Sequence, residues 1–154
     1  YARYRDKDEL FCAVLERKCA PVVFAEEFAA TPDRPLRDSL IAFSRSFLSL
    51  ILDDEPVRLH RVITAEGPRS PRVAELFMEN AVVRLKDRLA DWISAEVASG
   101  RLRTADPMGA AWRLLGALKG EAFMRASLGL SIGDPAELDR DTIACVDDFL
   151  RANS

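Results

Sequence analysis

Apolar residues recur along most of the chain at intervals of three and four, the spacing of one face of an α-helix. The clearest segment runs from residue 70 to residue 100, with apolar positions at Val73, Leu76, Phe77, Leu85, Leu89, Trp92, Ile93 and Val97. No segment alternates convincingly between apolar and polar residues, as a half-buried strand would. The pattern therefore predicts an all-α fold, a bundle of about six helices at roughly 6–30, 33–53, 55–66, 70–100, 105–128 and 135–152.

Prolines mark several of the expected helix starts. Three dipeptides place a capping side chain directly before a proline: Ser70-Pro71, Asp106-Pro107 and Asp134-Pro135. Proline suits the first helical position because the N–H that it lacks would have no partner there. Gly100 stands where the fourth helix is expected to end. Pro21 falls inside the first expected helix, which it should kink or split because it removes a backbone donor.

The composition is typical of one globular domain, with 49% hydrophobic and 31% charged residues in 154. The net charge of −3 provides no overall attraction to nucleic acid, so any DNA contact must be local. There is no run of about 20 apolar residues, so we expect no membrane span, and the charged opening residues do not resemble a secretory signal. The cysteines lack CxxC spacing and are odd in number, which fits the reducing cytoplasm: Cys12, Cys19 and Cys145.

Enzymatic chemistry finds little support in the sequence. His60 is the single histidine, so a two-metal bundle site built on Glu-x-x-His pairs cannot be assembled. No GxSxG segment, the elbow of a serine hydrolase, is present either. Cys12 and Cys19 share a helix face, as a redox pair or as buried small apolar residues. We therefore expect neither an enzyme nor a bound metal or other cofactor.

The opening stretch YARYRDKDELF combines two tyrosines with a helix start. Asp6 is the expected N-cap with Glu9 at the third helical position, which puts Lys7 in the first turn. A cation there is unfavourable because the helix N-terminus is already partly positive, and a bound phosphate would reverse that cost. Two interpretations remain open from spacing alone. Either this region contacts a phosphate, or Lys7 is merely exposed while Tyr1 and Tyr4 cover a core.

The segment YARYRDKDELFCAVL resembles the junction that ends the DNA-binding half of TetR-type transcriptional regulators. That resemblance implies that Tyr1 and Lys7 contact DNA phosphates, while Tyr4 packs the helix-turn-helix against the body. It further implies that residues 1–30 are the remnant of the DNA-binding domain, the end of its recognition helix, together with the connecting helix. Most of the helix-turn-helix would then precede residue 1.

Two downstream stretches, residues 58–93 and 98–121, resemble the C-terminal domain of AefR-like members of the same family. Residues 31–154 would accordingly be the ligand-binding and dimerisation domain. The resemblance implies a transcriptional repressor that acts as a homodimer, binds operator DNA and responds to a small hydrophobic or aromatic effector. The alternative is a helical module that binds a protein partner and no small molecule. An apolar cavity would favour the first interpretation, and an exposed apolar groove the second.

The expected effector pocket follows the family's central helix and shared helix faces. Its candidate residues are Phe47, Ile51, His60, Ile63, Phe77, Asn80, Arg84, Trp112 and Leu115. For His60, a capped or half-exposed position is the alternative to a ligand contact.

The expected dimer interface lies on the last two helices, with candidates Gly116, Gly120, Phe123, Ile143, Val146, Phe149 and Leu150. Ordinary core packing within one subunit is the alternative. The spacing of Gly109, Gly116 and Gly120 indicates close approach of another helix, either from the partner or from the same subunit.

Overall fold

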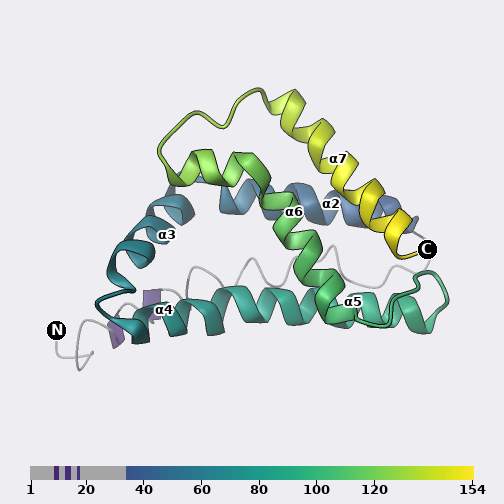
Figure 1. Cartoon of the computed structure of the whole chain (residues 1–154), viewed down its shortest axis with the longest axis horizontal. Helices are drawn as coiled ribbons and strands as arrows, with labels where there is room; N and C mark the ends of the chain where they lie inside the picture. Colours follow the sequence, from purple (N-terminus) through teal and green to yellow (C-terminus); the bar gives the residue numbers. More distant parts are fainter. Residues whose placement is uncertain (1–8, 11–12, 15–16, 18–33) are drawn as a thin grey trace.

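The computed structural model describes residues 9–10, 13–14, 17 and 34–154 (Figure 1). Residues 9–10, 13–14 and 17 are helical. The rest of the expected helix 6–30, with its break at Pro21, lies outside the described residues. The same holds for Tyr1, Tyr4, Lys7, Cys12 and Cys19.

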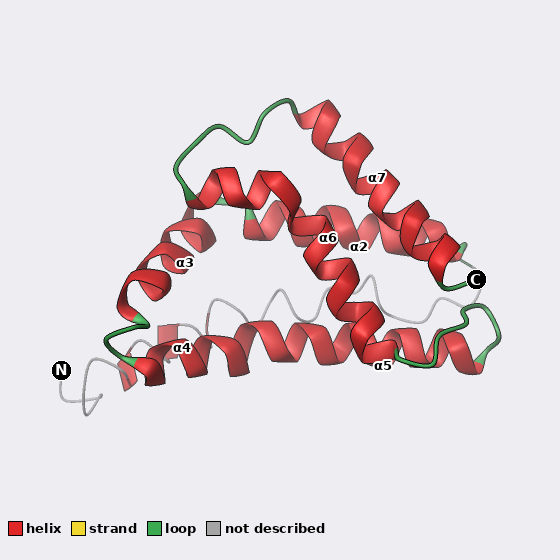
Figure 2. Ribbon diagram, viewed as in Figure 1, coloured by secondary structure: helices red, strands yellow, loops and turns green. Residues whose placement is uncertain are grey.

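The described chain from residue 34 onward is built of helices, and no strand occurs in that part. The helices are α2 (Leu36–Ile51), α3 (Asp54–Glu66), α4 (Pro71–Phe77), α5 (Arg84–Ala98), α6 (Pro107–Ser127) and α7 (Pro135–Ala152). A π-helical segment, η2 (Met78–Val83), joins α4 to α5, and Figure 2 shows all three as one continuous run. The all-α prediction is confirmed, and the expected helix 70–100 corresponds to this run.

Two of the three expected proline starts carry the predicted side-chain cap. The carboxylate of Asp106 accepts a hydrogen bond from the Gly109 N–H at 2.9 Å, and that of Asp134 accepts one from the Ala136 N–H at 3.0 Å. The prediction is wrong for Ser70, whose side chain makes no capping bond to α4. Its backbone carbonyl instead accepts the Val73 N–H, at 3.0 Å. Proline at the first position has no N–H, and the Val73 N–H has this carbonyl as its partner. These backbone positions at the start of α4 therefore need no hydrogen bond to the Ser70 hydroxyl.

The apolar interior is divided into a large cluster and a small one. The large cluster joins α2, α5, α6 and α7, and its most enclosed side chains include Leu40, Phe43, Phe47, Leu89, Ile93, Leu114 and Val146. The small cluster joins α3 to α4 through Ile63 and Val73, with Leu59 and Phe77 packed against them. The α3–α4 end of the molecule is therefore held by few apolar contacts, and its position depends on how α6 meets it.

Helix α6 bends at Gly120, and the bend directs its last turns toward α3. Gly120 has φ 44° and ψ −148°, which interrupts the helix. In Figure 1 the first part of α6 crosses α5, and the part after the bend runs toward α3. There the Arg61 guanidinium of α3 donates hydrogen bonds to the carbonyls of Ser127 and Ala126. Because the last carbonyls of a helix lack partners within it, Arg61 caps the end of α6.

The three glycines of α6 lie in different structural environments. A β-carbon at Gly109 would lie 1.9 Å from Oδ2 of Asp106, so the glycine allows the N-cap carboxylate to approach. Gly120 provides the positive φ of the bend. A β-carbon at Gly116 or Gly120 would meet no described atom within 4 Å. No described part of another helix therefore packs closely on these two positions, and close approach of a helix from the partner subunit stays a prediction.

Candidate ligand-binding site

Three helices bring aromatic rings together around His60. Its ring, on α3, lies 4.9 Å from the ring of Phe123 on α6 and 6.2 Å from that of Phe77 on α4, both centroid to centroid. Both pairs are edge-to-face, the arrangement in which the positive edge of one ring meets the negative face of another. His60 thus occupies the junction of α3, α4 and α6. We call His60, Phe77, Phe123 and the neighbouring Lys119 the ring cluster.

Lys119 adds a positive charge to the ring cluster. It precedes Phe123 by one helical turn, and its Nζ lies 5.1 Å from the centroid of the Phe123 ring, within cation–π range. Burial lowers the pKa of the Lys119 ammonium. Burial, and secondarily the charge of Lys119, lowers the pKa of His60, which favours the neutral imidazole. Lysine ordinarily carries a positive charge at neutral pH, so Lys119 is the cation of the ring cluster.

The π-helical segment passes beside the ring cluster. Asn80 lies in η2, one turn after Phe77, and is buried. Its side-chain N–H donates to the carbonyl of Leu76 at 2.9 Å, so this donor is used within its own helix. Short π-helical segments occur frequently at functional sites, because the wide turn changes the direction in which the following side chains point. The position of η2 next to Phe77 is a second feature that distinguishes this end of the molecule.

The ring cluster is only partly covered. His60, Phe77, Lys119 and Phe123 are all half-buried, whereas Ile63, in the small α3–α4 cluster with Phe77, is buried. Each ring therefore keeps apolar surface that the chain itself does not cover. Such rings, with a few polar groups among them, have the chemistry of a small-molecule site.

The nine expected pocket residues do not lie together. Phe47 and Leu115 are buried in the large cluster, and Ile51 packs at its edge. Arg84 is exposed, and Trp112 is 49% exposed on the outer side of α6. His60, Ile63, Phe77 and Asn80 lie at the α3–α4–η2 end. Phe123, expected at the dimer interface, contacts His60, and Lys119 was not among the expected residues.

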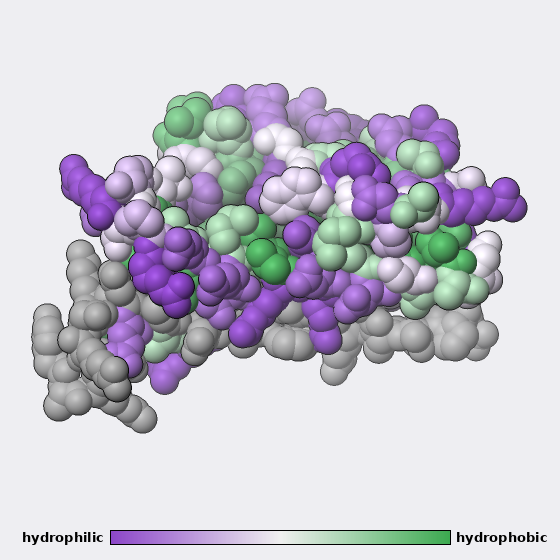
Figure 3. Space-filling view, turned by 60° about the horizontal axis from the view of Figure 1, so that its bottom comes forward, coloured by the Kyte–Doolittle hydropathy of each residue, from purple (hydrophilic) through white to green (hydrophobic). Residues whose placement is uncertain are grey.

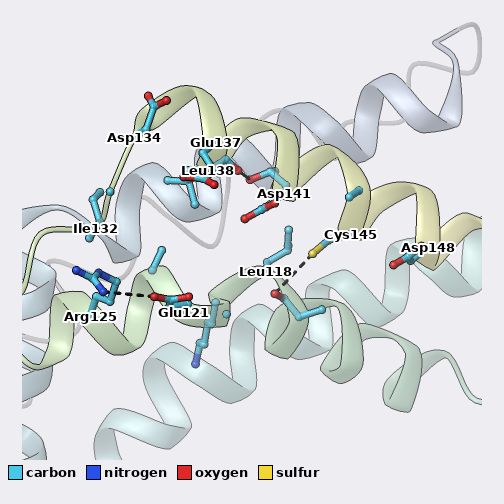
Figure 4. Close-up of a pocket in the computed structure, with 17 residues that line it drawn as sticks. Leu118, Glu121, Arg125, Ile132, Asp134, Glu137, Leu138, Asp141, Cys145 and Asp148 are labelled. Carbon is cyan, nitrogen blue, oxygen red and sulfur yellow. Dashed lines mark hydrogen bonds and ion pairs between the residues drawn. The ribbon is translucent and has the colours of Figure 1, made fainter.

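A groove of about 650 Å³ separates α6 from α7 (Figure 4). Asp134, Glu137, Asp141 and Asp148 lie along its α7 side in Figure 4, and Glu121 on its α6 side, where it pairs with Arg125 at 3.4 Å. Cys145 also lines it, and burial raises the pKa of this thiol. None of the nine expected pocket residues lines the groove. Of the expected dimer residues, Gly120 does.

The other expected dimer residues differ in exposure. Val146 and Phe149 are buried in the large cluster, while Ile143 and Leu150 are partly buried against it. Large apolar side chains are exposed instead along α6 and the loop after it, at Met108, Trp112, Met124, Leu128, Leu130 and Ile132. Figure 3 shows apolar side chains gathered near the end of the molecule where α6 enters the α6–α7 loop. Most of the exposed large apolar side chains among the described residues thus lie on α6 and its loop, while Val62 on α3 and Met78 in η2 are exposed as well.

Metal and membrane sites receive no support from the described residues. In that part of the chain, no three His, Cys, Asp or Glu side chains are grouped so that they would hold a metal ion. No helix there is both long enough and apolar enough to cross a bilayer.

Comparisons with known proteins agree on the family. The model of the AefR-like transcriptional repressor C-terminal domain matches residues 38–153. The solved structure of a TetR-family transcriptional regulator from Mesorhizobium loti is 25% identical with a TM-score of 0.90, and the match covers 100% of this chain and 78% of that one. The flavonoid-responsive regulator FrrA is 27% identical with a TM-score of 0.81, and the match again covers 100% of this chain and 78% of that one. No curated protein matches in sequence. The chain therefore belongs to the TetR family of transcriptional regulators and carries an AefR-like C-terminal domain.

Proposed function

We propose that this regulator is a ligand-responsive repressor and that its effector binds at the ring cluster. The observation that carries the proposal is the convergence of three half-buried rings, His60, Phe77 and Phe123, from three different helices. An aromatic effector inserted there would cover ring surface that the chain leaves exposed. The flavonoid-responsive relative supports an aromatic effector, since flavonoids are aromatic compounds.

The contacts between α3 and α6 suggest how binding would be transmitted. His60 contacts Phe123, and its neighbour Arg61 caps the end of α6. A ligand between the rings would therefore change the position of α3 relative to the last turns of α6. A ligand shifts a conformational equilibrium only through its different affinity for the two states, and the α3–α6 junction is where those states would differ.

We further propose a homodimer that uses the open side of α6 together with α7. A partner helix would find no side chain at Gly116 and Gly120 and would cover exposed apolar residues such as Trp112 and Met124. The buried Val146 and Phe149 would support this surface from below. In a twofold dimer both subunits contribute the same surface. The α6–α7 groove would lie within that surface, and its carboxylates would require arginines of the partner as counter-ions.

The DNA-binding part of the proposal concerns residues 1–30. Tyr1 and Lys7 would contact operator phosphates, and residues 31–154 would sense the ligand and dimerise. Two recognition helices enter successive major grooves when they lie about 34–36 Å apart. A change at the α3–α6 junction would release DNA by altering that spacing.

A thermal-shift screen of small aromatic compounds tests the sensing function. We expect some compounds to raise the melting temperature of the protein, because a ligand that binds only the folded state stabilises it. Phe123→Ala should abolish these shifts. Met124→Ala should leave them intact, because Met124 is the next residue on α6 and is 61% exposed. Shifts of equal size in the wild type and in Phe123→Ala would place the ligand elsewhere. If none of the aromatic compounds shifted the melting temperature of the wild type, the proposed function would be contradicted.

A further inference from the structure

The half-buried cation of the ring cluster specifies the charge of the ligand. In the described part of the chain, even exposed arginines meet a carboxylate. The guanidinium of Arg101 lies 2.6 Å from the buried Glu96, and Arg37 and Arg45 bind Asp147 and Asp139 through two hydrogen bonds each. None of the ion pairs found among the described residues includes Lys119.

The environment of Lys119 makes this arrangement costly. Lysine usually extends its ammonium into water, and a partly desolvated charge without a counter-ion is unfavourable. The contact with the Phe123 ring offsets a part of this cost. The adjacent His60 adds no negative charge, and burial, with a smaller contribution from repulsion by Lys119, lowers its pKa. Lys119 also lines the α6–α7 groove with Glu121, Glu137 and Asp141, but none of the ion pairs among the described residues joins it to them. An anion at the ring cluster would give this ammonium a direct counter-ion.

The geometry also limits where such an anion would sit. Phe123 is within 5.1 Å of the Lys119 Nζ and within 4.9 Å of the His60 ring, measured from ring centroids. A ligand ring against Phe123 would therefore lie beside a residue whose ring centroid is 5.1 Å from the ammonium. Asn80 is a weaker polar partner, because its N–H donor is already bound to Leu76.

We propose that the effector is an aromatic carboxylate, whose ring lies against Phe77 and Phe123 and whose carboxylate pairs with the Lys119 ammonium. This inference rests on the proposed sensing function and specifies its ligand class. A neutral aromatic compound of the same shape would keep the ring contacts but leave the charge of Lys119 uncompensated. Selectivity between the two is the measurable consequence.

The experiment compares two probes of nearly the same shape, the anionic 2-naphthoate and the neutral 2-naphthamide. Calorimetric titration at low salt up to about 1 mM probe gives both dissociation constants, since screening weakens exposed charge pairs. We expect the wild type to bind the naphthoate roughly 10- to 100-fold more tightly, the range of a hydrogen bond to a charged group. Lys119→Met should remove this preference by weakening naphthoate binding much more than naphthamide binding. Lys86→Met removes the same charge from α5 and should preserve the preference.

The outcomes separate this inference from the function on which it rests. Equal affinity of the wild type for both probes, or a preference that survives in Lys119→Met, overturns the carboxylate assignment while ligand sensing stands. Failure of both probes to bind overturns it as well, and the screen of aromatic compounds then decides the sensing function separately. Circular dichroism melts of both lysine variants check that they are folded, and methionine is close to lysine in length.

Discussion

For the bend in α6, helix propensity and the structure predict opposite effects on stability when Gly120 is replaced by alanine. In an ordinary helix interior, replacing glycine by alanine stabilises the protein by about 1 kcal/mol. Gly120 instead has φ 44° and ψ −148°, a conformation that residues other than glycine adopt at a cost of about 1–3 kcal/mol. A β-carbon there would meet no described atom within 4 Å, so this cost is conformational and not steric. We therefore predict that Gly120→Ala destabilises the protein by about 1–3 kcal/mol.

Urea denaturation followed by circular dichroism measures the free energy of unfolding for each variant. The control is Ala95→Gly, at an exposed position in the last turn of α5, which should cost up to about 1 kcal/mol and reports the ordinary difference between the two residues. Because Lys119 and Phe123 stand on either side of the bend, Gly120→Ala should also weaken aromatic ligands. A Gly120→Ala variant that is more stable than the wild type would show that α6 is straight, and the reasoning about the α3–α6 junction would fail.

Three further predictions concern the junction and the dimer. Arg61→Leu should destabilise the protein by about 1 kcal/mol because it leaves the Ser127 carbonyl without this donor, while the Ala126 carbonyl keeps the Gly129 N–H. Hydrogen exchange should accelerate at the end of α6, whereas Arg58→Leu, also at an exposed site on α3, should cause neither change. The folded state lowers the pKa of His60 from 6.5, so it binds that proton more weakly than the unfolded state does. Acidification below about pH 6.5 should therefore cost the wild type stability, and His60→Phe should lose that part of the pH dependence in urea melts. Gly116→Arg should shift the dimer toward monomer in sedimentation velocity, and an unchanged dimer would move the interface away from this side of α6.

The helices were predictable because their signals are local. The expected last helix, 135–152, has the bounds found for α7, since Asp134 and Pro135 mark its start and its apolar period is regular. The cap at Ser70 was not predictable in the same way, because a nearby carbonyl takes the role of the hydroxyl. The π-helical turn of η2 also leaves no mark in the apolar spacing, since it shifts the helix by a single residue.

The ring cluster was predictable only in part, because it depends on tertiary geometry. His60 and Phe77 were found from a single histidine and from the face of one helix. Trp112 was assigned to the pocket, yet it lies on the exposed side of α6. Periodicity assumes one straight axis, and the bend at Gly120 breaks the relation between faces before and after it. For the same reason Phe123 was expected at the dimer interface, and Lys119 went unnoticed, although a lysine one turn before an aromatic residue was visible in the sequence.

Release of operator DNA by a ligand at the ring cluster is the most direct test of the whole account. The protein expressed from its complete reading frame would be titrated onto labelled DNA from the region upstream of that frame, with fluorescence anisotropy as the readout. We predict that an aromatic compound that raises the melting temperature also lowers the affinity for this DNA, and that Phe123→Ala binds the DNA but no longer responds. If the compound releases DNA equally from Phe123→Ala, or binds the protein without changing DNA affinity, the ring cluster does not control DNA binding.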